Sequence, residues 1–81
     1  MKKFKVIYPN GSSVMLSERP SLDEMQKIIG GYIELVKLER STMWVNEDGI
    51  RLGLPRNEFA SVVSGQSIVG VVILEFTVKQ D

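Results

Sequence analysis

The chain has 81 residues, with ten basic against ten acidic side chains, and contains neither cysteine nor histidine. A chain this short has room for a single domain, residues 1–81, with a modest core. The balanced charge argues against general nucleic-acid binding. The missing cysteine and histidine exclude disulfides, thiol nucleophiles, serine–histidine catalysis and the usual zinc sites.

Neither a signal peptide nor a membrane span is expected. Residues 4–8 are too short to be the apolar core of a signal peptide. The longest apolar run, residues 68–74, falls well short of the roughly 20 residues that span a bilayer. With the absence of cysteine, this favours a protein of the reducing cytoplasm that has no membrane partner.

The N-terminal segment predicts a β-hairpin. Residues 4–8 are rich in β-branched and aromatic side chains and alternate as a strand does. Asn10-Gly11 supplies two residues that tolerate positive φ, as a type I′ turn requires. Residues 13–16 are therefore expected to return as the second strand.

A short helix is expected over residues 22–29. Ser21 and Glu24 have the spacing of a capping box, in which each side chain accepts a hydrogen bond from the backbone amide of the other. Gly30-Gly31 ends the helix, with one glycine suited to the left-handed conformation. The expected apolar stripe consists of Leu22, Met25, Ile28 and Ile29.

The middle of the chain predicts three further strands. Residues 32–38 and 42–45 are joined by a short link, so they are expected to pair as antiparallel neighbours. Residues 46–49, Asn-Glu-Asp-Gly, fit a type I turn closed by a left-handed glycine. Residues 50–52 are then the return strand, which Pro55 brings to an end because proline cannot donate a ladder hydrogen bond.

The C-terminal third predicts a second helix and the longest strand. Asn57 fits the N-cap of a helix that runs to about Ser64. Residues 68–78 are the expected strand, apolar on both faces as far as Ile73, which is typical of a central strand covered on both sides. The expected apolar stripe of the helix consists of Phe59, Val62 and Val63.

Together these elements predict an α+β domain with a mainly antiparallel sheet of five to six strands and two short helices packed on one face. The second face then needs cover, either from the N-terminal hairpin or from another subunit. Cover by another subunit would make the protein a homo-oligomer, a dimer or higher.

Tyr32 and the stretch from residue 44 to 57 supply the candidate ligand-binding residues. Tyr32 and Trp44 can stack on a nucleotide ring, although in a small domain such side chains are more often core or interface anchors. Arg56 stands beside the N-terminus of the second helix, where an anion is expected to settle, although surface arginines usually only add solubility. The candidate set is Tyr32, Trp44, Arg51, Arg56 and Asn57.

No catalytic residue, metal ligand or cofactor is expected. Glu34 and Glu75 can pair for acid–base chemistry, but each more often lies on a solvated edge or faces a lysine. The acidic turn at residues 46–49 lacks the spaced ligands of a calcium loop.

Four motifs resemble a known family. In order they are Gly30-Gly31-Tyr32-Ile33-Glu34, Val45-Asn46-Glu47-Asp48-Gly49, Gly53-Leu54-Pro55 with Asn57, and Ile68-Val69-Gly70. Over about residues 22–74 they resemble the family known as domain of unknown function 3846, and the N-terminal hairpin is matched only loosely. Such small proteins occur in phages, plasmids and integrative elements. The resemblance implies no activity and favours an accessory protein of a mobile element.

Two functional hypotheses remain. The first is a non-enzymatic interaction protein, a homo-oligomer that acts in the host cytoplasm by binding a host protein. The alternative is an oligomeric small-molecule binder that sequesters a nucleotide immune messenger, with Tyr32, Trp44, Arg51 and Arg56 lining a pocket shared between subunits. An enzyme is least favoured, because activity would depend on carboxylates and lysines alone.

Overall fold

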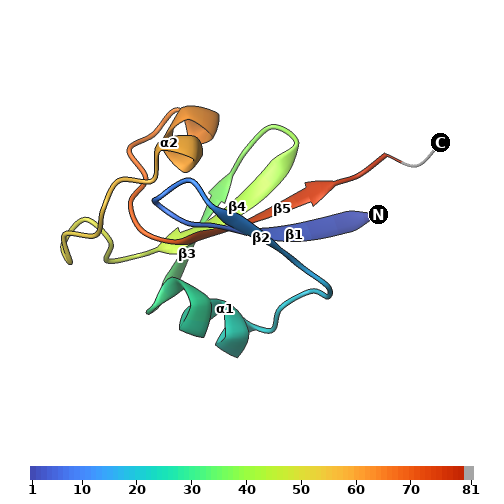
Figure 1. Ribbon diagram of the computed structural model, residues 1–81, viewed down its shortest axis with the longest axis horizontal. Coiled ribbons are helices and arrows are strands. Elements are labelled where there is room, and N and C mark those ends of the chain that lie inside the picture. The colour runs from blue at the N-terminus through green and yellow to red at the C-terminus, as the bar shows by residue number, and fades with distance from the viewer. Residues whose placement is uncertain (80–81) are drawn as a thin grey trace.

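The structure, a computed structural model, describes residues 1–79. This part of the chain contains five strands and two helices (Figure 1). Their bounds are β1 Lys2–Ile7, β2 Ser13–Leu16, α1 Leu22–Ile29, β3 Ile33–Lys37, β4 Ser41–Asn46, α2 Glu58–Ser64 and β5 Val72–Thr77. Neither helix of the described part has the length and apolar character that a membrane crossing requires.

The strands form one antiparallel sheet in the order β2-β1-β5-β4-β3. The central strand is β5, which pairs with β1 on one side and with β4 on the other. Its residues Val72 and Ile73 point to opposite faces, and both are fully buried at 0% exposure. The predicted α+β class and antiparallel sheet are confirmed.

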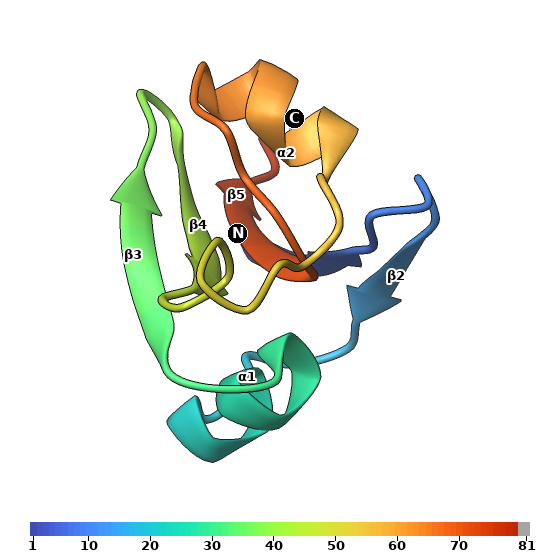
Figure 2. The same ribbon diagram turned by 90° about the vertical axis from the view of Figure 1, so that its left-hand side faces the viewer.

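The two helices lie on opposite faces of the sheet (Figure 2). On the α1 face, Met25 and Ile29 of the helix pack with Ile73 of the central strand. On the α2 face, Ala60 of the helix packs with Val72. The prediction that both helices pack on one face is therefore wrong. Because β5 is apolar on both sides, each side needs its own cover.

The sheet divides the hydrophobic core into two clusters. The cluster on the α1 face consists of Phe4, Val6, Met25, Ile29 and Ile73. The cluster on the α2 face consists of Ile7, Met43, Val45, Ala60, Ile68 and Val72. Since each face carries a cluster and a helix, the uncovered face that favoured a homo-oligomer is not found in residues 1–79.

The first hairpin forms in the expected place but with a different turn. The amide of Gly11 donates to the carbonyl of Tyr8 at 3.0 Å. Gly11 has a φ of 92°, whereas Asn10 does not have positive φ, and a type I′ turn needs positive φ at both central residues. The predicted type I′ turn is therefore wrong. The Oδ1 atom of Asn10 instead accepts a hydrogen bond from the amide of Ser12 at 2.9 Å.

A loop of successive turns occupies residues 47–55, where a return strand was expected. The amide of Leu52 donates to the carbonyl of Asp48 at 2.9 Å, which is a helix-like contact and not a ladder bond. Gly53 follows with a left-handed φ of 68°. The predicted strand over residues 50–52 is therefore wrong, and of the expected five to six strands the described residues form five.

Gly49 makes a close contact and does not close a left-handed turn. Its φ is not positive, so the predicted left-handed conformation is wrong. A Cβ at this position would lie 2.7 Å from Cγ2 of Val69 and 3.3 Å from the carbonyl oxygen of Asn46. The position requires glycine because there is no space for a side chain.

The predicted strand over residues 68–78 is interrupted at Gly70, where φ is 82°. Such a φ is incompatible with an extended strand of L-residues. Before the bend, Val69 forms an isolated antiparallel bridge with Arg56. After it, β5 begins at Val72, so the strand prediction is wrong for its first residues.

Candidate functional site

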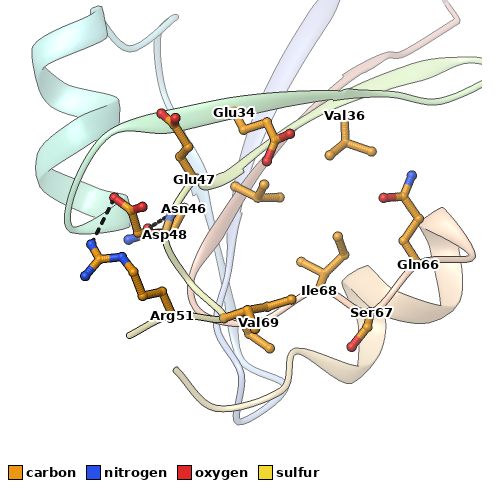
Figure 3. Close-up of a pocket in the computed structure, with 12 residues that line it drawn as sticks. Glu34, Val36, Asn46, Glu47, Asp48, Arg51, Gln66, Ser67, Ile68 and Val69 are labelled. Carbon is orange, nitrogen blue, oxygen red and sulfur yellow. Dashed lines mark hydrogen bonds and ion pairs between the residues drawn. The ribbon is translucent and has the colours of Figure 1, made fainter. Parts of the chain in front are cut away.

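A cleft of about 260 Å³ lies beside the loop that follows β4, in the region where the sequence placed its candidate residues. Glu34 and Val36 extend from β3 toward Ile68, which lies in the segment after α2 (Figure 3). The loop contributes Asp48 and Arg51 at one side. The cleft is therefore formed by parts of the chain that are distant in sequence.

The charges around this cleft are mainly negative. Its lining carries the carboxylates of Glu34, Glu47 and Asp48 against the guanidinium of Arg51. An Nη atom of Arg51 lies 3.4 Å from a carboxylate oxygen of Asp48, so this positive charge already has a partner. The cleft suits a cation or a hydrogen-bond donor better than it suits a phosphate.

Asn46 holds the wall of the cleft in place. It is 7% exposed, and its Oδ1 accepts a hydrogen bond from the amide of Asp48 at 2.8 Å. Its Nδ2 donates to the carbonyl of Ile29 at the end of α1, at 3.4 Å. The Asn-acid-Gly motif thus holds the loop against the first helix, through the hydrogen bonds of the Asn46 side chain.

Asn57 is completely buried, at 0% exposure. Its Oδ1 accepts a hydrogen bond from the amide of Ala60 at 3.1 Å, which confirms the predicted N-cap. Its Nδ2 donates to the carbonyl of Ile7 at 3.1 Å and to the carbonyl of Gly70 at 2.9 Å. Every polar atom of this side chain is engaged within the fold, so none faces a ligand.

The remaining candidate residues do not surround one cavity. Trp44 packs in the cluster on the α1 face, with its ring centroid 6.4 Å from that of Phe4. Tyr32 is 70% exposed just before β3. The Nε atom of Arg56 donates to a carboxylate oxygen of Glu58 at 3.0 Å. Of the five candidates, Arg51 is the one that lines the cleft.

The apolar stripe that was predicted to bury α2 faces the solvent instead, so that prediction is wrong. Phe59, Val62 and Val63 are exposed, and the small residues Ala60 and Ser61 are the buried ones. The signal that could have shown this is the pair of small residues itself, because small side chains allow a helix to approach a sheet closely.

Glu34 and Glu75 lie on opposite faces of the sheet and do not pair. Glu34 is opposite Val45, a member of the cluster on the α2 face. Glu75 is opposite Phe4, on the α1 face, and is 6% exposed. Within residues 1–79, no three Asp or Glu side chains are grouped as metal ligands.

Neither a curated protein nor a solved structure matches this chain. One family does match, and its match takes in the N-terminal hairpin, for which the sequence had shown only a loose resemblance. The chain belongs to the family described as Domain of unknown function (DUF3846), which matches residues 1–78.

Proposed function

We propose that the protein is a non-enzymatic interaction protein of a phage or other mobile element, and that it acts in the host cytoplasm by binding a host protein. The orientation of α2 is the observation that carries this proposal. Phe59, Val62 and Val63 are 46%, 69% and 44% exposed on this short helix. Adjacent apolar side chains turned to solvent offer the kind of surface to which a partner docks. The absence of cysteine and histidine supports a role without catalysis.

Buried polar contacts hold the helix in this orientation. The hydroxyl of Ser61 donates to the carbonyl of Ile68 at 3.0 Å and accepts from the amide of the same residue at 2.9 Å. The N-cap Asn57 adds its two bonds to backbone carbonyls outside the helix. Rotating the helix to bury Val62 would break these hydrogen bonds. The apolar side chains of α2 therefore remain exposed to solvent in the folded single chain.

A shallow cleft of about 200 Å³ adjoins this helix and extends the surface toward the first hairpin. It is lined by Phe59 together with Lys5, Ile7, Gly11 and Ser13. Complete burial of one large apolar side chain is worth about 1.5–3 kcal/mol. Three partly exposed side chains therefore supply a few kcal/mol, and a small number of such anchors carries most of the binding energy in an interface.

The test is affinity capture from a lysate of the host with three baits: the wild type, Val62→Glu and Leu22→Glu. Leu22 is a matched control because it is 58% exposed on the other helix. We expect a partner that the wild type and Leu22→Glu retain and that Val62→Glu loses, with unchanged circular dichroism for all three. Equal capture by Val62→Glu would contradict the proposed surface.

We propose the same surface for association between copies of the chain. Sedimentation velocity at micromolar concentration should show the wild type and Leu22→Glu as a dimer or larger species and Val62→Glu as a monomer. A monomeric wild type would remove the homo-oligomer from the proposal and leave the host protein as the partner.

The nucleotide-binding alternative draws no support from the predicted residues, because Arg51 and Arg56 each already pair with a carboxylate. A thermal shift screen with linear and cyclic nucleotides separates the two hypotheses. A true ligand at a hundredfold excess over its dissociation constant stabilises the fold by about 2.7 kcal/mol.

A further inference from the structure

The two ends of the sheet carry different charges, although the chain has no net charge. The acidic cleft lies at the end where β4 finishes at Asn46. At the other end, β1 begins at Lys2, which pairs with Thr77 at the end of β5. The turn between β3 and β4 lies at this same end and contains Arg40. Basic residues that are distant in sequence therefore meet there.

A cleft of about 220 Å³ lies at this basic end. Lys2 from β1, Lys37 from β3 and Arg40 from the turn all line it. The hydroxyl-bearing residues Ser41, Thr42 and Thr77 line it as well. Three cationic groups and three potential hydroxyl donors thus border one concave space.

The buried carboxylate of this cleft is already neutralised. An oxygen of Glu75 lies 3.1 Å from Nζ of Lys2 and 3.5 Å from an Nη atom of Arg19. Lys37 and Arg40 make no ion pair within residues 1–79. The lining also contains Glu39, an exposed residue. Positive charge therefore remains available to a ligand.

We infer that this cleft binds the phosphate group of a small phosphate monoester. A guanidinium recognises phosphate through its fork of parallel N–H donors, and a lysine adds a compact positive charge. The hydroxyls supply neutral donors to the remaining oxygens. The volume of about 220 Å³ accommodates a phosphate group with a small part of the molecule that carries it. This site uses none of the residues on α2, so it is separate from the proposed protein-binding surface.

The test is a titration of the ¹⁵N-labelled protein, followed through its amide resonances at constant ionic strength, which keeps general charge screening fixed. The probes are inorganic phosphate, glycerol 3-phosphate, glycerol and a short single-stranded DNA without a terminal phosphate. We expect both phosphates to produce saturable shifts at Ser41, Thr42 and Thr77, and glycerol to produce none. No saturable shift with either phosphate would overturn the inference, as would binding of the DNA alone.

Three variants make the test specific. Arg40→Gln should weaken glycerol 3-phosphate binding about tenfold, because it removes a charged hydrogen-bond donor. Glu39→Gln should tighten it about twofold to fivefold, because it removes a nearby negative charge. Arg56→Gln is the matched control, since it removes an exposed arginine at a different place, and it should leave the affinity unchanged. Equal weakening by Arg56→Gln and Arg40→Gln would show a diffuse charge effect and overturn the inference.

Discussion

Replacing Asn57 tests how strongly the hydrogen bonds between α2 and the rest of the fold stabilise the protein. Replacing this asparagine with alanine removes one hydrogen bond within α2 and two that reach other segments. The amide of Ala60 loses its acceptor at 3.1 Å, and the carbonyls of Ile7 and Gly70 lose donors at 3.1 and 2.9 Å. All of these bonds are buried, so solvent does not readily replace them.

The expected loss in the free energy of unfolding is about 3 kcal/mol. Loss of an N-cap costs about 1 kcal/mol, and each carbonyl that loses a buried donor adds about 1 kcal/mol. A domain of this length has a total stability of roughly 4–12 kcal/mol, so Asn57→Ala removes a large share of it. The midpoint of thermal unfolding should fall by about 12–24 °C.

Asn57→Asp separates capping from the longer-range bonds. It keeps the acceptor for Ala60, but it cannot donate to the carbonyls of Ile7 and Gly70 and places a carboxylate oxygen against theirs at a fully buried position. Urea unfolding followed by the fluorescence of Trp44, the single tryptophan, should therefore show both variants strongly destabilised. Ser21→Ala, at the exposed N-cap of α1, is the control and should lose only about 1 kcal/mol. Wild-type stability in Asn57→Asp would refute the reasoning.

Two further predictions concern packing and pH. Gly49→Ala should lose about 1–3 kcal/mol because its Cβ would lie 2.7 Å from Cγ2 of Val69, and adding Val69→Ala should restore much of that loss in urea unfolding. No rescue by the double variant would contradict the contact. Hydrogen bonds from the backbone amide and the hydroxyl of Ser21 lower the pKa of Glu24 below its ordinary value of 4.5. Because the folded-state pKa is the lower one, the stabilisation is complete above 4.5 and is lost as the pH falls through the folded-state value. The free energy of unfolding of Glu24→Gln should therefore fall less than that of the wild type when the pH is lowered from 7 to 3. An equal fall in both proteins would contradict this prediction.

The elements that the sequence predicted well depend on near neighbours. The capping box of α1 forms as expected, and Gly30 ends the helix with a left-handed φ of 91°. Each of these features is decided within a few residues. The predicted positions of both helices and of the first hairpin follow from the same local rules.

The predictions that failed depend on contacts that the local pattern does not contain. The side of α2 that faces the sheet is set by bonds from Asn57 and Ser61 to other segments. Position 49 requires glycine because the side chain of Val69, twenty positions further along the chain, leaves no space for a Cβ. Its role therefore could not be read from the turn in which it stands.

The candidate site was predictable only in part. Arg51 is the one candidate that lines the acidic cleft, and the acidic character of that cleft depends on Glu34 from another strand. The basic cleft was not predicted at all, because Lys2, Lys37 and Arg40 come together only through the strand order. That order was not derivable from one sequence.

The central position of β5 determines when this protein can fold. The strands before it form two separate hairpins, β1 with β2 and β3 with β4, and within residues 1–79 β5 is the only strand that pairs with both. During synthesis the hairpins therefore leave the ribosome before the strand that pairs with both of them, and an isolated two-stranded hairpin is marginally stable at best. Both clusters are completed when Val72 and Ile73 arrive between the hairpins. Folding should then occur as a single late event, and a chain that stops before β5 should remain unfolded.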